Sequence, residues 1–338
     1  MNKPGICVIG AGFIGSKHAE TYAQSSRCHL ISVCDAEASR AGLLAKRLGC
    51  SAITDWRAAL EDPKVHAVSV CLPEDAHTLV TVGALTAGKS VLLEKPMATT
   101  LDDCDRMIEA SQANQAILMI AHLLRFDARY AQAYHAIRQG EIGDIVHIVC
   151  QRNGMFSAQR DTSLLFHVGI HDYDVALWMS NSKPKSIFSA KVVKDRTVRH
   201  TEESVFSLIE FADGSMATVG SSWSLPDDAG SQVNSRLEVL GTNGLIRIEG
   251  GVGPTLAIFG KSGWRYPDVF HWPVVAGATQ GCLRQEIEHF LACVGSHREP
   301  AVSVHESKEA VQTVLAAIES FNKKTPFILE GGETWNSQ

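Results

Sequence analysis

The sequence predicts an α/β protein that begins with a doubly wound parallel sheet and continues as an α+β domain on a large, mainly antiparallel open sheet. Up to about residue 121, short apolar runs alternate strictly with amphipathic helical patterns. Beyond that residue, several apolar runs follow one another with turn signals between them. At 338 residues the chain is long enough for two domains, and we place them at residues 1–121 and 122–338.

In the first half, strands are expected where β-branched residues cluster, and helices where apolar residues recur every three to four positions. The expected strands are 6–9, 29–34, 51–55, 66–72, 90–94 and 116–120, and the expected helices begin near 13 and cover 38–48, 56–60, 74–87 and 101–114. Asp55 is the expected N-cap of the short helix after it. Ligands of such sheets bind beyond the carboxyl ends of the strands, so the residues there are candidates for a site.

In the second half, strands stand between two groups of helices. The expected helices are 130–139, 163–179, 285–295 and 305–321, and the expected strands are 145–151, 186–194, 203–211, 215–223, 236–241, 245–249 and 327–329. Asp213-Gly214 and Asn243-Gly244 mark hairpin turns. One face of this sheet should cover helices. The other is rich in Val, Ile and Phe, which favours a contact between subunits. The tail 331–338 is expected to be loosely ordered.

A glycine-rich turn follows the first strand. Gly10, Gly12 and Gly15 have the G-x-G-x-x-G spacing between a strand and a helix. Gly10 permits the tight turn, Gly12 lets a pyrophosphate approach the backbone, and Gly15 lets helix and strand pack closely. Phe13 and Ile14 begin the helix, whose N-terminal N–H groups and dipole attract phosphates. The turn therefore predicts a dinucleotide site.

Asp35 ends the second strand, twenty residues beyond Gly15, where a carboxylate accepts hydrogen bonds from the adenosine ribose. It would repel a 2′-phosphate, so NAD is favoured over NADP. Arg40 is the nearest cation, and we expect it to face solvent on the next helix. The alternative interpretation is an ordinary glycine turn beside an unrelated surface aspartate.

Composition excludes several classes of protein. The net charge of −6 leaves no basic stripe for nucleic acid or anionic membranes. No apolar run reaches membrane-spanning length, and the N-terminus leaves no room for a signal peptide before the first strand. Nine cysteines without a C-x-x-C pair indicate buried thiols in a reducing compartment. We therefore expect a cytoplasmic protein.

Lys95 follows the fifth strand in Glu94-Lys95-Pro96. There its ammonium could hydrogen-bond a substrate hydroxyl and stabilise the alkoxide as hydride leaves. Pro96 fixes its own φ and stops the strand, which aims the lysine. The alternative is a solvated lysine at a strand end.

His122 and Arg125 stand at the junction between the two halves. Clefts between domains are usual places for small ligands, so His122 is expected to line such a cleft and Arg125 to hold substrate hydroxyls or a carboxylate. An interdomain salt bridge is the equal alternative for Arg125.

His167 and His171 share a helix face at i, i+4, and Asp174 lies three residues further on. A histidine oriented by a carboxylate is a ready general acid or base. Two histidines at this spacing are also the start of a metal site, but no third ligand is evident and we expect no metal. Surface or capping histidines are the structural alternative.

Together these segments resemble the glucose–fructose oxidoreductase/inositol dehydrogenase (Gfo/Idh/MocA) family over nearly the full length of the chain. The matching pieces are Val8–Gly15 with Asp35, Cys71-Leu72-Pro73 with His77, Glu94-Lys95-Pro96, His122 with Arg125-Phe126, Gly169-Ile170-His171-Asp172-Tyr173-Asp174, Leu240–Gly244 and Glu288-His289-Phe290.

The resemblance implies an N-terminal NAD(P)-binding Rossmann domain and a C-terminal substrate-binding sheet that mediates homodimers or homotetramers. It also implies NAD(P)-dependent oxidation of sugars, inositols or related polyols. It assigns catalysis to Lys95 and His171, with Asp174 in support. Leu72, Pro73, His77 and Glu94 join the expected cofactor contacts. Arg152, and more weakly Trp223, join His122, Arg125 and His171 as expected substrate contacts.

One position departs from the family pattern, because His167 stands where many polyol dehydrogenases have an aspartate. A neutral histidine does not raise the basicity of His171 as a carboxylate would. Either the substrate is atypical or His167 itself accepts the proton. Two other functions remain as alternatives, an NAD-dependent glycosidase that uses transient oxidation and a catalytically silent NAD-binding protein.

Overall fold

The computed structural model describes residues 3–155, 162–194, 202–226, 229, 231, 233–250, 255–261 and 263–329. The chain forms two compact units. The first comprises Met1–Asp127 and Val269–Lys308, and the second comprises Ala128–Asp268 and Glu309–Gln338. The tail 331–338, expected to be loosely ordered, lies outside the described residues.

The first unit contains the expected parallel sheet. Its strand order is β3-β2-β1-β4-β5-β6, and every neighbouring pair is parallel. The strands are β1 (Gly5–Ile9), β2 (His29–Cys34), β3 (Ser51–Ile53), β4 (Ala67–Val70), β5 (Ser90–Leu93) and β6 (Leu118–Ile120). Strand order reverses direction beside β1, so the carboxyl ends of β1 and β4 flank the point where ligands of doubly wound sheets bind.

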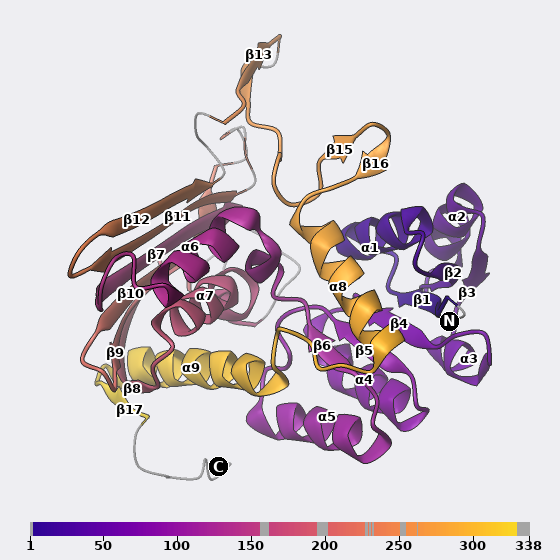
Figure 1. The fold of residues 1–338 in the computed structure, drawn as a ribbon, viewed down its shortest axis with the longest axis horizontal. Coiled ribbons are helices and arrows are strands. Elements are labelled where there is room, and N and C mark those ends of the chain that lie inside the picture. The colour runs from indigo at the N-terminus through magenta and orange to yellow at the C-terminus, as the bar shows by residue number, and fades with distance from the viewer. Residues whose placement is uncertain are drawn as a thin grey trace. The chain divides into compact units, whose positions relative to one another are not determined.

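Helices cover both faces of this sheet. They are α1 (Phe13–Gln24), α2 (Ala38–Leu48), α3 (Trp56–Glu61), α4 (His77–Thr86), α5 (Leu101–Asn114) and α8 (Cys282–Ser296). Figure 1 shows α1 and α8 on one side of the sheet and α4 and α5 on the other. The expected cap is confirmed, because the Asp55 side chain accepts a hydrogen bond from the Arg57 N–H.

One part of the first unit comes from late in the sequence. A short hairpin, β15 (Val274–Val275) and β16 (Ala278–Thr279), precedes α8 and contacts α1. We define residues 269–281, which include this hairpin, as the returning arm. The sequence does not predict this hairpin, because a two-residue strand carries almost no periodicity.

The second unit is built on a sheet with the order β12-β11-β7-β10-β9-β8-β17. Its strands are β7 (Ile145–Met155), β8 (Pro184–Val192), β9 (Ser204–Phe211), β10 (Met216–Leu225), β11 (Val233–Gly241), β12 (Leu245–Gly250) and β17 (Phe327–Ile328). All neighbours are antiparallel except β7 and β10, which confirms a mainly antiparallel sheet. A separate hairpin joins β13 (Ile258–Gly260) to β14 (Gly263–Arg265).

Helices lie on one side of this second sheet: α6 (Ala128–Arg138), α7 (Ile170–Ser180) and α9 (Val304–Lys323) (Figure 1). The expected helix over 163–179 is corrected in part. A π-helical turn over Leu165–Gly169, which is wider than an α-helical turn, precedes the regular α7.

The other side of the second sheet carries exposed apolar side chains. Buried and exposed residues alternate along β9, which places Val205 and Ile209 inside and Phe206 and Leu208 outside. Phe188 on β8 pairs with Leu208 on this outer face. The expected apolar outer face is therefore present in the described strands.

Candidate active site

The glycine turn has the geometry that a phosphate-binding turn needs. Gly10 follows β1 with φ +101°, and its N–H donates to the Cys34 carbonyl at 2.8 Å. A Cβ at Gly10 would overlap the Cys71 carbonyl, and one at Gly15 would overlap the Gly10 carbonyl. At Gly12, by contrast, no described heavy atom lies within 4 Å of the position a Cβ would take. Space is therefore left open at Gly12, at the N-terminus of α1, where a pyrophosphate fits.

Asp35 is held beside this turn. Its Oδ2 accepts a hydrogen bond from the Ala11 N–H at 2.9 Å, and its Oδ1 accepts one from the Glu37 N–H at 2.9 Å. A carboxylate has about four acceptor positions. Two backbone donors therefore fix its plane and leave acceptor capacity for ribose hydroxyls. The chain's own residues fit a dinucleotide across this edge.

Arg40 faces solvent, as expected, and it also pairs with the two acids beside the turn. Its Nη1 lies 3.3 Å from Asp35 Oδ2, and its Nη2 lies 2.6 Å from Glu37 Oε2, although the side chain is still 49% exposed. The reason is local. Arg40 lies one helical turn after Glu37, which brings a long side chain back over both acids.

His77 joins the loops that follow β4 and β5. Its Nδ1 lies 2.9 Å from the Pro96 carbonyl and its Nε2 lies 2.9 Å from the Leu72 carbonyl. Burial lowers the pKa of this imidazole, while the two carbonyls oppose that shift. His77 was expected to contact the cofactor. In the structure it contacts the backbone carbonyls of Leu72 and of Pro96, the residue after Lys95.

Glu94 is held by His18, a residue that the sequence did not indicate as part of the site. His18 on α1 is fully buried, with Nε2 3.2 Å from Glu94 Oε1 and Nδ1 2.8 Å from the Ser69 hydroxyl. Burial raises the pKa of Glu94, but the hydrogen bond and charge of His18 and the charge of Lys95 outweigh it and lower the pKa overall. Glu94 Oε2 accepts from the Lys95 N–H at 3.2 Å. The start of the Lys95 segment is thus anchored, and the Lys95 side chain is half-buried.

His122 and Arg125 lie next to one another in the first unit. His122 is buried just before a 3₁₀ turn over Leu123–Phe126. The Arg125 guanidinium is buried and lies 2.7 Å from Glu306 Oε2. This ion pair lies within the first unit, so it is not the interdomain salt bridge that was the alternative for Arg125.

In the second unit the candidate residues gather at the start of α7. His171 is half-buried in the first turn of α7, and Asp174 is buried one turn later. His167 lies in the π-helical turn, with its Nε2 2.5 Å from the Thr162 hydroxyl and its ring stacked on Trp223 at 6.1 Å between centroids. The widened turn at His167 could not be anticipated from residue spacing.

Arg152, an expected substrate contact, forms a buried pair instead. Its Nε and Nη2 each lie 3.0 Å from a carboxylate oxygen of Asp172, and both side chains are at least 90% buried. Burial raises the pKa of Asp172, and Arg152 opposes that rise. Sequence reasoning missed Asp172, although it stands beside His171. The pair ties α7 to β7.

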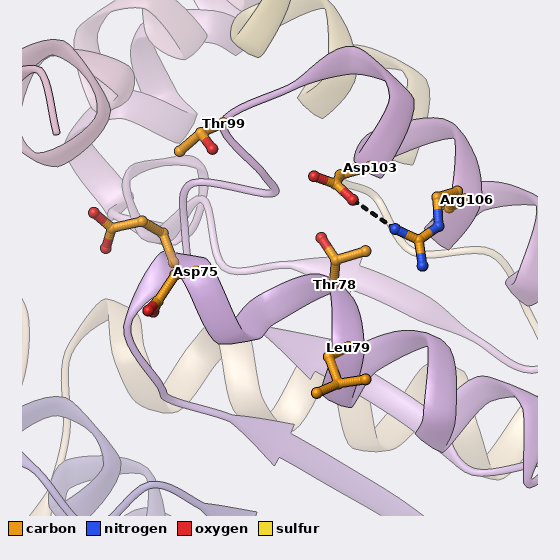
Figure 2. Close-up of a pocket in the computed structure, with 7 residues that line it drawn as sticks. Asp75, Thr78, Leu79, Thr99, Asp103 and Arg106 are labelled. Carbon is orange, nitrogen blue, oxygen red and sulfur yellow. Dashed lines mark hydrogen bonds and ion pairs between the residues drawn. The ribbon is translucent and has the colours of Figure 1, made fainter.

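A small polar pocket lies at the starts of α4 and α5 (Figure 2). Its lining residues are Glu74, Asp75, Thr78, Leu79, Thr99, Asp103 and Arg106. Its volume of about 220 Å³ is below the roughly 300–1,000 Å³ usual for ligand sites. None of the expected site residues lines it. Arg106 and Asp103 pair within it at 2.9 Å.

Comparison with known proteins places this geometry in context. Residues 5–122 match the family model described as "Oxidoreductase family, NAD-binding Rossmann fold", and residues 130–247 match the GFO/IDH/MocA C-terminal domain. The chain belongs to the Gfo/Idh/MocA family. The prediction of an NAD-dependent oxidoreductase with a Rossmann sheet is thereby confirmed.

Two relatives are similar to this chain over nearly their full length. A Thermotoga maritima protein named myo-inositol 2-dehydrogenase is 26% identical over 334 residues, covering 96% of this chain and 98% of its own. A Bacillus subtilis protein named scyllo-inositol 2-dehydrogenase (NAD(+)) is 27% identical over 342 residues, covering 96% and 95%. The crystal structure of scyllo-inositol dehydrogenase from Lactobacillus casei with bound NAD(H) and scyllo-inositol shares the fold. Its TM-score is 0.82 at 19% identity, with 98% and 100% coverage.

Two further observations concern the described residues alone. No helix there has both the length and the apolar character needed to cross a membrane. No group of three His, Cys, Asp or Glu side chains there is arranged to hold a metal ion.

Proposed function

We propose that this protein oxidises a secondary alcohol of a cyclitol or a related sugar-like polyol, with NAD⁺ as the hydride acceptor. The observation that carries the proposal lies in the parallel sheet of the first unit. Lys95 follows β5 on the same edge where β1 and β2 end in the glycine turn and Asp35. The inositol 2-dehydrogenase names of the relatives support the substrate class.

NAD⁺, when bound, supplies the hydride acceptor, and the chain's own residues handle the proton and the developing charge. Gly12 and the N-terminus of α1 hold the pyrophosphate, and Asp35 holds the adenosine ribose. The Lys95 ammonium donates a hydrogen bond to the substrate oxygen and stabilises its developing negative charge. The alcohol loses a hydride from carbon and a proton from oxygen, which leaves a carbonyl group.

His171 is the proposed acceptor of that proton, with Asp174 as the supporting carboxylate on α7. His167 is the alternative acceptor, because it replaces an aspartate common in the family. Its stacking on Trp223 and its contact with Thr162 restrain its ring, which suits a positioning role better than a mobile proton shuttle. His122 and Arg125 remain proposed substrate contacts.

The proposal is tested with a panel of cyclitols, sugars, sugar acids and nucleotide sugars, following the NADH absorbance band. We expect turnover with at least one cyclitol or polyol. Lys95→Met should abolish that turnover while NADH still binds, and Lys46→Met, at an exposed lysine on α2, should leave both unchanged. NADH binding without turnover on the whole panel would contradict the proposal, as would full activity of Lys95→Met. Cleavage of nitrophenyl glycosides without net NADH would indicate the glycosidase instead.

We also propose that a second copy of the chain covers the outer face of the second sheet. Phe206 is 57% exposed and Phe188 is 44% exposed on neighbouring strands, and the Phe206 ring lies over Gly220. Phe206→Glu should convert a dimer or tetramer to monomers in light scattering. Phe259→Glu, at an exposed residue on β13, is the control. A wild-type monomer would contradict this part of the proposal.

For localisation we propose the cytoplasm. All nine cysteines are free thiols, and most are buried, as expected in a reducing compartment. Fractionation of the source cells, with the protein followed by antibody, tests this assignment.

A further inference from the structure

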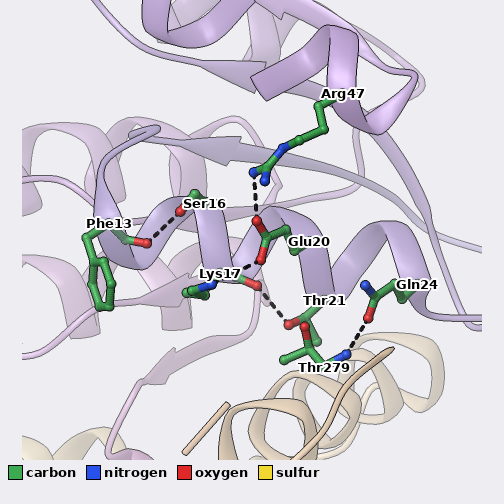
Figure 3. Close-up of polar contacts among 8 residues, drawn as sticks. All are labelled: Phe13, Ser16, Lys17, Glu20, Thr21, Gln24, Arg47 and Thr279. Carbon is green, nitrogen blue, oxygen red and sulfur yellow. Dashed lines mark hydrogen bonds and ion pairs between the residues drawn. The ribbon is translucent and has the colours of Figure 1, made fainter. Parts of the chain in front are cut away.

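The returning arm, residues 269–281, is fixed along α1. The Thr279 N–H donates to the Gln24 side-chain oxygen at 2.8 Å, at the far end of α1 from the glycine turn (Figure 3). Near the start of the arm, the Phe270 carbonyl accepts a hydrogen bond at 2.9 Å from the N–H of Cys282, the first residue of α8. Gly281 has φ +81°, and a Cβ there would overlap the Phe270 carbonyl. These hydrogen bonds attach the arm to α1 and to the start of α8.

This attachment brings Trp272 to the start of α1. Its ring meets the ring of Phe13 edge to face, with 5.6 Å between centroids and an interplanar angle of 76°. Trp272 also packs on the core of the first unit, and His271 lies beside it at 5.4 Å. Because Trp272 packs against this core, it can hold the Phe13 ring in place.

Phe13 is a large apolar residue at an exposed position. It is the first residue of α1, directly after Gly12, and it remains 60% exposed although Trp272 touches it. Figure 3 shows its side chain projecting from the start of the helix. A large apolar surface next to a phosphate-binding turn gains free energy when a ligand covers it. The same surface excludes water and ions, which strengthens the attraction between phosphates and the helix N-terminus.

We propose that Phe13 and Trp272 form an aromatic cover beside the pyrophosphate of the bound dinucleotide and slow its release. This inference rests on the proposed placement of NAD across Gly10–Gly15. The pair acts as a unit, because Phe13 supplies the covering ring and Trp272 sets its orientation from the returning arm.

The test measures NADH release by stopped-flow displacement, and NADH affinity at several salt concentrations. Trp272→Ala and Phe13→Ala should each raise the release rate about 3- to 10-fold, the size of an aromatic pair contribution. Both should make affinity more sensitive to salt, since ions then reach the phosphates. The double variant should resemble either single variant, because removal of one ring disables the pair.

Trp264→Ala is the matched control, because Trp264 is an exposed tryptophan on β14 whose ring contacts Phe259 in the second unit. Phe13 is exposed, so its replacement keeps the test valid even if Trp272→Ala does not fold. Release rates and salt dependence of Phe13→Ala equal to wild type would overturn the aromatic cover alone. Failure of the wild type to bind NADH would overturn the proposed cofactor site as well.

Discussion

Arg152 and Asp172 are joined by two contacts of 3.0 Å inside the second unit, where both side chains are buried. Arg152 belongs to β7, and Asp172 lies in the first turn of α7, next to His171. The pair therefore fixes the helix turn that carries the proposed base. Because both charges are removed from water, each is stabilised by the opposite charge of its partner.

Replacement of one partner of this pair should be costly. Asp172→Asn leaves a buried guanidinium charge unpaired, and we expect a loss of about 3–5 kcal/mol in the free energy of unfolding measured with urea. The apolar double variant Arg152→Met/Asp172→Leu should recover most of this loss. Glu210→Gln, which breaks the exposed pair with Lys185, should cost about 1 kcal/mol or less. Equal effects of Asp172→Asn and Glu210→Gln would contradict the account.

The glycines of the first turn should separate binding from stability. Gly15→Ala forces a Cβ against the Gly10 carbonyl, so we expect a loss of about 1–3 kcal/mol in thermal or urea unfolding. Gly12→Ala meets open space and has φ −71°, so the protein should fold normally. Its methyl group would occupy the space proposed for the pyrophosphate, and NADH affinity should fall at least about tenfold by fluorescence titration. Unchanged NADH affinity of Gly12→Ala would argue against a phosphate at this position.

Asp35 should set the choice between NAD and NADP. Asp35→Ala removes charged hydrogen bonds to the ribose, each of which is worth about 1.5–3 kcal/mol, so the Kd for NADH should rise about 10- to 100-fold. Affinity for NADPH should fall less or improve, because Arg40 remains beside the site and the repelling carboxylate is gone. Asp55→Ala, which removes an exposed helix cap, should leave both affinities unchanged. An equal loss of affinity for NADH and NADPH would show that Asp35 does not discriminate between them.

Glu286 on α8 should make stability depend on pH. Burial raises its pKa, Glu94 adds to the rise and His18 opposes it, and Tyr22 lies nearby. Neither carboxyl oxygen has a hydrogen-bond partner among the described residues. Because the pKa of Glu286 is higher in the folded state than in the unfolded state, protonated Glu286 makes its full contribution to the free energy of unfolding below the unfolded pKa. It is lost as pH rises through the folded pKa.

Glu286→Gln removes this titration. Its melting temperature should exceed that of wild type at pH 8, and the difference should shrink as pH falls toward 5. Glu299→Gln, at an exposed position beyond the same helix, serves as the control. A gain in melting temperature that is the same at pH 8 and pH 5 would rule out titration of Glu286 as the cause.

The first sheet was predictable because its signals are local. Gly49 and Asp55 mark helix ends in the sequence itself, and α2 and α5 have the expected bounds. The strand order of the second sheet could not be predicted from such local signals. The parallel pairing of β7 with β10 joins residues far apart in sequence, and alternation along each strand cannot reveal its neighbour.

The site was predictable to the same degree. Gly12, Asp35 and Lys95 could be proposed as site residues from the sequence because they stand in short motifs with fixed spacing. The partners Glu306, His18 and Trp272 could not be found, because each is brought to Arg125, Glu94 or Phe13 only by the folded chain. The π-helical turn at His167 likewise has no signal in residue spacing.

The most direct measurement of the central claim is a crystal structure grown with excess NAD. We expect the pyrophosphate at Gly10–Gly15, the adenosine ribose on Asp35 and the nicotinamide ring directed at Lys95. An empty turn, or a nicotinamide ring directed away from Lys95, would contradict the account.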